Sequence, residues 1–156
     1  MGEIKQMEEK VKNLILQGAF TQAEKHVTEL SEESLHDILF EIGFDEFSVC
    51  TYSFVCFLMQ QQETEKLHHL AIGLLVNTLY HIDGMYESIL YHVRRLIELS
   101  PDDIELEELL IFAHGLPVDQ KLVSEEEVVR IAKKVLLQKP NSIGAQYVLQ
   151  HAKTHN

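Results

Sequence analysis

The sequence predicts an all-α fold, and three observations support this prediction. The chain has 156 residues, of which 46% are hydrophobic, and leucine, isoleucine, valine and glutamate are abundant. It contains only three prolines and seven glycines, the residues that most often interrupt helices. Apolar residues recur at intervals of three and four along most of the chain, which is the spacing of one helix face. We expect about nine helices and no strand, in a single domain over residues 1–156.

The first half of the chain is expected to form five helices separated by short polar turns. Gly18 ends the first, Ser31 has the character of an N-cap, and Gly43 ends the third. Asp45 is the expected cap of the fourth helix, and Asp83-Gly84 forms a turn after the fifth. The fourth and fifth helices are apolar on nearly all sides, so we expect them to be the most buried. The expected ranges are 3–17, 21–30, 31–43, 46–62 and 66–82.

The second half contains two stop–start signals built on proline, because the residue before proline avoids helical dihedral angles. Ser100-Pro101 ends one helix and opens the next, and Lys139-Pro140 repeats the pattern. Ser124 and Glu127 have the spacing of a reciprocal capping box. The segment 115–123 is the longest expected loop. The expected helices are 85–99, 102–114, 124–138 and 142–153.

An internal repeat favours stacked helix pairs. When residues 93–110 are laid over 132–149, Arg94-Arg95 falls on Lys133-Lys134 and Pro101 falls on Pro140. Two segments of similar pattern, each crossing a helix-ending proline, are typical of repeat architectures. We therefore predict stacked antiparallel helix pairs in a short α-solenoid, with an irregular helical bundle as the alternative.

The stretch from residue 67 to residue 101 resembles a degenerate tetratricopeptide repeat. In that family a tyrosine lies near the end of the first helix, followed by a glycine turn, an aromatic residue, a second helix and a closing proline. This chain has Tyr80, Gly84, Tyr86 and Pro101 at those places, whereas Gly73 stands where the family prefers a bulky aromatic residue. Residues 11–30 resemble the same unit through Gly18, Phe20 and Ala23. The resemblance implies antiparallel helix pairs whose concave surface binds peptides or partner helices.

The charge balance and the cysteines indicate which partners and compartment to expect. The chain has 13 Lys and Arg residues and 25 Asp and Glu residues, which gives a net charge of -12. Such a surface repels phosphate, so we expect neither a nucleic-acid nor a membrane partner. Cys50 and Cys56 are expected to be small buried residues in a reducing cytoplasm. The N-terminal residues do not have the pattern of a signal peptide.

Catalytic and metal-binding patterns are weak. Two Glu-x-x-His pairs occur, Glu33–His36 and Glu65–His68, which is a number that chance explains in a chain with nine histidines and many glutamates. Neither a glycine-rich phosphate loop nor a nucleophile elbow is present. We therefore expect no catalytic residues, no metal, no cofactor and no enzymatic activity.

The leading functional interpretation is a non-catalytic protein–protein interaction module with an acidic surface. Its partner is expected to be a basic protein or peptide, and the sequence does not specify an oligomeric state. Five acids lie within seven positions from Asp102, and Glu105 and Glu108 share an outward helix face with Asp102. These three residues, with Tyr80 and Tyr91, are the predicted partner-binding residues.

Two other functions remain open at this stage. A small, acidic, helical protein suits an immunity or antitoxin-type inhibitor that neutralises a basic toxin such as a nuclease. A helix-bundle enzyme is the second alternative, and stoichiometric metal or a buried polar cluster would favour it.

Overall fold

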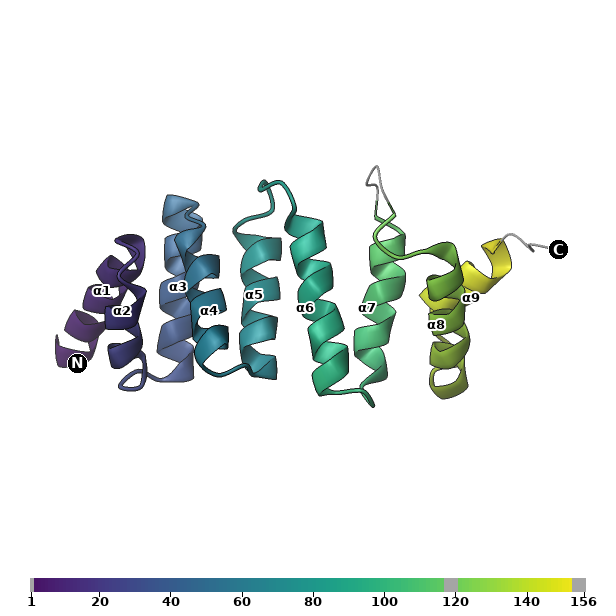
Figure 1. Cartoon of the computed structure of the whole chain (residues 1–156), viewed down its shortest axis with the longest axis horizontal. Helices are drawn as coiled ribbons and strands as arrows, with labels where there is room; N and C mark the ends of the chain where they lie inside the picture. Colours follow the sequence, from purple (N-terminus) through teal and green to yellow (C-terminus); the bar gives the residue numbers. More distant parts are fainter. Residues whose placement is uncertain (1, 117–120, 153–156) are drawn as a thin grey trace. The chain divides into compact units, whose positions relative to one another are not determined.

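The computed structural model describes residues 2–116 and 121–152, and this part of the chain is all-α (Figure 1). It contains nine helices and no strand, so the predicted fold class is confirmed. No helix among these residues is long enough and apolar enough to cross a membrane. The helices are α1 (Gly2–Leu16), α2 (Phe20–Val27), α3 (Glu32–Glu46), α4 (Cys50–Gln61), α5 (Glu65–Asn77), α6 (Met85–Leu99), α7 (Ile104–His114), α8 (Glu125–Gln138) and α9 (Ile143–His151).

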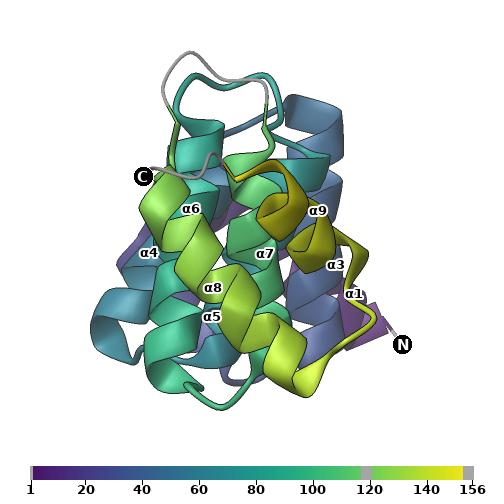
Figure 2. The same ribbon diagram turned by 90° about the vertical axis from the view of Figure 1, so that its right-hand side faces the viewer.

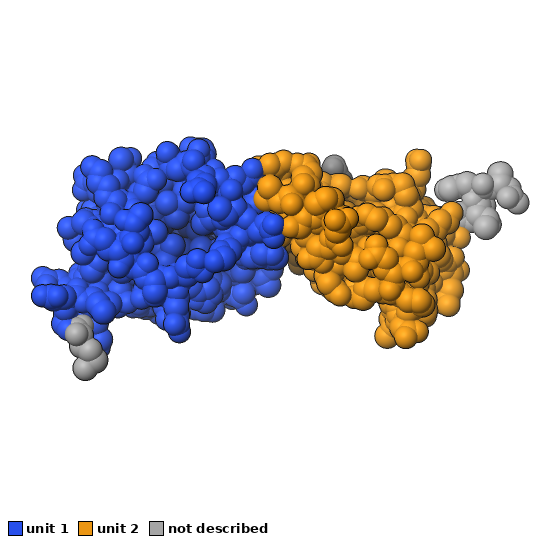
Figure 3. Space-filling model, turned by 90° about the horizontal axis from the view of Figure 1, so that it is seen from below, with its two compact units in different colours: residues 1–85 blue, residues 86–156 orange. Residues whose placement is uncertain are grey.

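The chain divides into two compact units, residues 1–85 and residues 86–156, which Figure 3 colours separately. Each unit has buried hydrophobic residues of its own. The single domain expected over 1–156 stays a prediction.

The first unit has two layers of helices. In one layer α3 packs against α1 and α5, and in the other α2 packs against α4. Between the layers α1 contacts α2 and α4, and α4 contacts α3 and α5, so that α2 and α4 lie in front of α1 and α3 in Figure 1. Packing between consecutive and alternate helices is compatible with a short helical solenoid.

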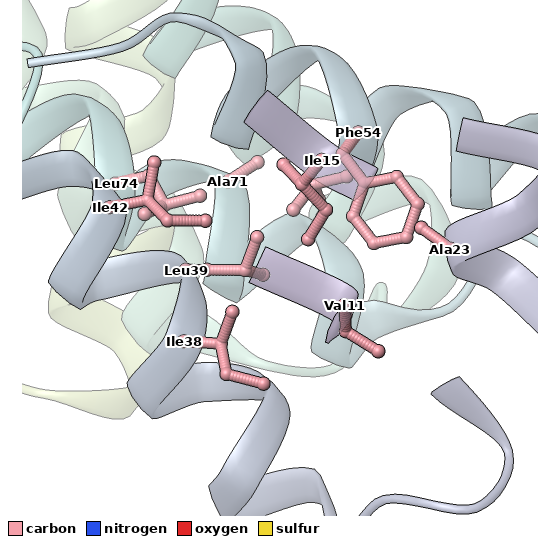
Figure 4. Packing of buried hydrophobic residues seen from close by; sticks show 10 residues of the cluster. Val11, Ile15, Ala23, Ile38, Leu39, Ile42, Phe54, Ala71 and Leu74 are labelled. Atoms are coloured by element: carbon pink, nitrogen blue, oxygen red, sulfur yellow. The ribbon is translucent and has the colours of Figure 1, made fainter. Parts of the chain in front are cut away.

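The core of the first unit lies between these layers (Figure 4). Phe54 of α4 is fully buried, and its ring centroid lies 5.4 Å from that of Phe20. Every side chain of α4 from Cys50 to Met59 is buried or half-buried, because helices of both layers surround it. The other fully buried hydrophobic residues of this cluster are Val11, Ile15, Ala23, Leu39, Ile42, Val55, Ala71 and Leu74.

Two expected boundaries in the first unit are wrong. Gly43 does not end α3, and Asp45 does not cap α4, because α3 continues to Glu46. Gly43 is buried against Thr78, and a Cβ at position 43 would lie 2.7 Å from the Thr78 hydroxyl oxygen. The helix ends at Phe47, which has a left-handed φ of 49°. Before α4, the hydroxyl of Ser48 accepts a hydrogen bond from the Cys50 N–H at 3.2 Å.

The turn after α5 combines an early helix end with the expected glycine. The helix expected to reach residue 82 ends at Asn77, and Thr78 Oγ1 donates a hydrogen bond to the Leu74 carbonyl at 2.9 Å. Gly84 has a φ of 80°, as expected for a residue that lets the chain reverse without the strain of a Cβ. Gly18 has the same role after α1, with a φ of 70°.

In the second unit, α8 packs against α7 and α9, and α7 packs against α9. Ser124 and Ser142 cap α8 and α9 as N-caps, but α7 is capped by Asp103 rather than by Ser100. Glu127 was expected to complete a capping box. Its N–H donates to Ser124 Oγ at 3.1 Å, while its carboxylate pairs with the Arg94 guanidinium of α6 at 2.7 and 3.0 Å. That pair lowers the pKa of Glu127.

Part of the expected loop 115–123 and the end of the expected helix 142–153 lie outside the described residues, at 117–120 and 153.

The buried hydrophobic residues of α7, α8 and α9 are Leu106, Leu110, Ile111, Val128, Ile131, Ala132, Val135 and Ala145.

Candidate protein-binding site

The acidic residues of α7 take part in an ion-pair network within the second unit. Lys139, the residue that ends α8, lies with its Nζ 2.7 Å from Glu105 Oε1 and also pairs with Glu108. The Ser142 hydroxyl donates a hydrogen bond to Glu108 Oε1 at 2.5 Å. Glu107 is buried and pairs with Lys134 of α8. These contacts join α7 to α8 and to Ser142, the N-cap of α9.

The network favours the ionised form of Glu108 and offsets part of its charge. Hydrogen bonds from Lys139 and then from Ser142 lower the pKa of Glu108. The carboxylates of Glu105 and Glu108 raise the pKa of Lys139. Glu105 keeps an exposed side chain, and Asp102 is exposed, so both remain reachable by a partner. The acidic stripe is therefore part of the packing of α7 against α8 as well as a charged surface.

An open cavity of about 700 Å³ lies beside this network, between α7, α8 and α9. In Figure 2, α8 and α9 lie toward the viewer and α7 lies behind them. We call this cavity the α7–α9 groove. Glu108 and Ser142 line it, so the groove and the ion-pair network share a wall. Its apolar lining residues are Ile111, Phe112, Leu116, Val128, Val129, Ile143, Tyr147, Val148 and Ala152.

Three large apolar side chains of the groove are unusually open to solvent. Phe112 is 70% exposed, Ile143 is 83% exposed and Tyr147 is 61% exposed. The Tyr147 ring stacks on the His151 ring at a centroid distance of 4.0 Å. Exposed apolar groups that gather around one hollow are typical of an interaction site rather than of an ordinary surface.

Sequence reasoning missed this groove. The available signal was the four-residue spacing of Ile143 and Tyr147, which places both on one face of the last helix. That face could be recognised as exposed only after the packing of α9 against α7 and α8 was known. Of the predicted site residues, only Glu108 lines the groove.

The two predicted tyrosines are exposed, and they belong to different units. Tyr80 lies between α5 and α6 in the first unit, with its ring 5.6 Å from that of His81. Tyr91 lies on α6 in the second unit, with its ring 5.1 Å from that of His92. Each is more than half exposed, as a partner-binding aromatic residue would need to be.

The histidines and cysteines have other surroundings. His68 is fully buried, and its Nε2 lies 2.9 Å from Glu63 Oε1. Within the described ranges, no three His, Cys, Asp or Glu side chains are grouped so that they could hold a metal ion. Cys50 and Cys56 are free thiols, and burial raises the pKa of Cys56, which makes it less reactive.

Comparisons with protein-family models, with curated proteins and with solved structures found no match to this chain. The resemblance to tetratricopeptide repeats therefore stays a prediction.

Proposed function

We propose that this protein is a non-catalytic protein-interaction module, and that its α7–α9 groove binds an apolar, basic segment of a partner protein. The observation that carries the proposal is the exposure of Phe112, Ile143 and Tyr147 around one cavity. Covering such side chains removes apolar surface from water, which is the main favourable contribution to most protein association. Aromatic and aliphatic anchors in a pocket are also where binding energy concentrates.

The charges of the groove favour a basic segment. Among the described residues that line it are the carboxylates of Glu108 and Glu125, and none of these described residues is a Lys or Arg. The low pKa of Glu108 favours its negative form, and Lys139 offsets only part of that charge. A Lys or Arg beside the apolar anchors of the partner would complement this charge, and the net charge of -12 would speed the encounter.

The helical architecture and the thiols are consistent with this function. Stacked helix pairs bind peptides and partner helices, and a tetratricopeptide-like repeat is the form of that architecture that we propose here. Two free thiols suit a reducing compartment, so we propose that the module acts in the cytoplasm.

A peptide library displayed on phage tests the proposal. Selection on the full chain should enrich peptides that combine apolar anchors with Lys or Arg. Ile143→Ser should weaken the binding of a selected peptide by about tenfold or more, since that is the loss expected at an anchor of an interface. Because Ile143 is 83% exposed, this change should leave the fold intact.

Leu137→Ser is the matched control. Leu137 is 85% exposed on α8 and does not line the groove, so its replacement should leave peptide binding unchanged. Equal losses in the two variants, or no enrichment of apolar basic peptides, would refute the proposed site.

A further inference from the structure

A second surface, on α3 of the first unit, combines aromatic rings with carboxylates. His36, Phe40 and Phe44 follow one another at intervals of four, so they lie along one side of the helix. The His36 and Phe40 rings are stacked at 4.2 Å between centroids, and the Phe40 and Phe44 rings are 6.2 Å apart. We call these three residues the aromatic row. Phe44 at its end is 52% exposed.

The neighbouring helix makes room for this row. A Cβ at position 73 of α5 would lie 3.1 Å from Phe40 Cζ, so Gly73 allows the ring to lie close against the α5 backbone. Beyond Gly73 on α5, Val76 is 50% exposed. Apolar surface is therefore present on both helices.

Four acids run beside the aromatic row at the same spacing. They are exposed, and we call them the acidic row: Glu33, Asp37, Glu41 and Asp45. Glu33 lies in the first turn of α3, where an acid stabilises the helix. Like charges four residues apart repel one another, so helix stability does not explain Asp37, Glu41 and Asp45. Among the residues that the structure describes, the lysine paired with the row is Lys12 of α1, whose Nζ lies 2.7 Å from Glu41 Oε1. Asp37 also lies 3.4 Å from His36 Nδ1.

Core packing accounts for Phe40 but not for the rest of the two rows. The side of α3 that packs into the first unit carries Ile38, Leu39, Ile42 and Gly43, all of them buried, and half-buried Phe40 packs against the same cluster. His36, Phe44 and the acidic row are exposed, so polar residues at those positions would leave the buried side unchanged.

The net negative charge of the chain is concentrated in the unit that carries this surface. Residues 1–85 contain five Lys and Arg against 14 Asp and Glu, whereas residues 86–156 contain eight against 11. The first unit therefore has a net charge of -9, compared with -3 for the second. A cationic partner is attracted to the first unit more strongly.

We propose that this surface of α3 is a docking site for a basic amphipathic helix of a partner protein. Apolar side chains of that helix lie on the aromatic row, and its Lys and Arg side chains lie against the acidic row. Two parallel rows with a four-residue spacing match the spacing of an amphipathic helix that runs alongside α3. A lysine or arginine beside Phe44 would also gain a cation–π contact. The site is separate from the α7–α9 groove and does not depend on it.

The probe for the test is a synthetic peptide of leucine and lysine that forms an amphipathic helix. It is titrated into the full chain labelled with ¹⁵N, and binding is followed by NMR and by calorimetry at two salt concentrations. We expect shift changes centred on α3 and on Val76 of α5, and an affinity that falls as salt rises. A peptide with glutamate in place of each lysine should not bind.

Two variants separate the parts of the surface. Asp37→Lys with Asp45→Lys should weaken binding by about tenfold or more and reduce its salt dependence. Phe44→Ala should weaken binding while leaving the salt dependence unchanged. The matched control, Glu87→Lys with Glu126→Lys, makes the same change of charge on exposed residues of the second unit and should retain most of the affinity.

Several outcomes would overturn the proposal. They are equal losses in the two charge-reversal variants, unchanged affinity in Phe44→Ala, or shift changes confined to α7, α8 and α9. The peptide is itself apolar and basic, so it also suits the α7–α9 groove. Every titration is therefore made in the Ile143→Ser background, where the shift changes of α3 should remain. Failure of the α3 site is thus distinguishable from failure of the groove.

Discussion

Phe54 is the residue on which the core of the first unit depends most. It is fully buried and is the largest of the fully buried side chains. Its ring lies 5.4 Å from Phe20 and 6.3 Å from Phe57, measured between centroids. A single ring thus joins α2 to α4 inside the cluster that also contains side chains of α1, α3 and α5.

We expect Phe54→Ala to lower the free energy of unfolding by about 3–5 kcal/mol, because it removes a buried ring and leaves a cavity. Chemical denaturation measures this loss. Phe44→Ala is the control, since Phe44 is 52% exposed, and it should cost less than about 1 kcal/mol. A loss below that level for Phe54→Ala would show that Phe54 is not a core residue.

Gly43 is required by packing rather than by backbone conformation. It lies inside α3, where alanine normally stabilises a helix, but a Cβ there would lie 2.7 to 2.8 Å from three side-chain atoms of Thr78. We therefore expect Gly43→Ala to destabilise the protein by about 1–3 kcal/mol. Thr78→Gly in the same chain should recover part of the loss, measured as a double-mutant cycle of thermal unfolding. Additive effects of the two changes would contradict the contact.

At the scale of the helix, the contacts of α7 show how a charged stripe can be structural. Its N-cap Asp103 accepts a hydrogen bond from the backbone of the helix. Three of its own acids pair with lysines: Glu107 with Lys134 of α8, and Glu105 and Glu108 with Lys139 at the end of α8. Reversing Glu105 and Glu108 to lysine would place two further cations beside Lys139. Such a variant should lose stability, so it does not isolate a role in binding.

The pairing of Glu108 gives the stability of the second unit a specific pH dependence. Since Lys139 and Ser142 lower its pKa below the ordinary value of 4.5, its contribution is fully present above that value. It is lost as the pH falls through the lower pKa of the folded state. We expect Glu108→Gln to be less stable than the wild type at neutral pH, and the difference to shrink at acidic pH.

Urea denaturation across this pH range measures the difference between the two proteins. Glu126→Gln is the control, because Glu126 is an exposed residue of the first turn of α8. A constant difference between wild type and Glu108→Gln at all pH values would contradict the role given to the ion pair.

At the scale of the molecule, the division into residues 1–85 and 86–156 falls at the start of α6. The hydrophobic cluster of the first unit draws its residues from α1 to α5 alone. The boundary separates only the first residue of α6, Met85, from the rest of that helix, and all other helices lie within one unit.

We expect a fragment of residues 1–85 to fold by itself, because it contains the whole of that cluster. Circular dichroism should show a helical spectrum and a cooperative thermal transition. A fragment of residues 1–61 lacks Ala71 and Leu74 of α5 and should not unfold cooperatively. A fragment 1–85 that stays unfolded would mean that the full chain is one cooperative domain.

The sequence alone determined the features that depend on neighbouring residues. The class of the fold and the number of helices follow from apolar spacing, and Ser31 and Ser124 are N-caps as expected. A cap needs only a hydroxyl and a backbone N–H three residues further on, so its signal lies within one turn. Gly18 and Gly84 were recognisable for the same reason, since a left-handed turn is a local property of the backbone.

Only the tertiary structure decided the features that join residues distant in sequence. Position 43 within α3 needs a glycine because Thr78 packs against it, and no local pattern around Gly43 indicates that contact. Glu105 and Glu108 are paired because Lys139, 34 and 31 residues later, reaches both. The α7–α9 groove is lined by three helices, and the exposure of its apolar side chains depends on how those helices pack. A helical pattern specifies which side of a helix is apolar, but the neighbours that cover that side or leave it open come from elsewhere in the chain.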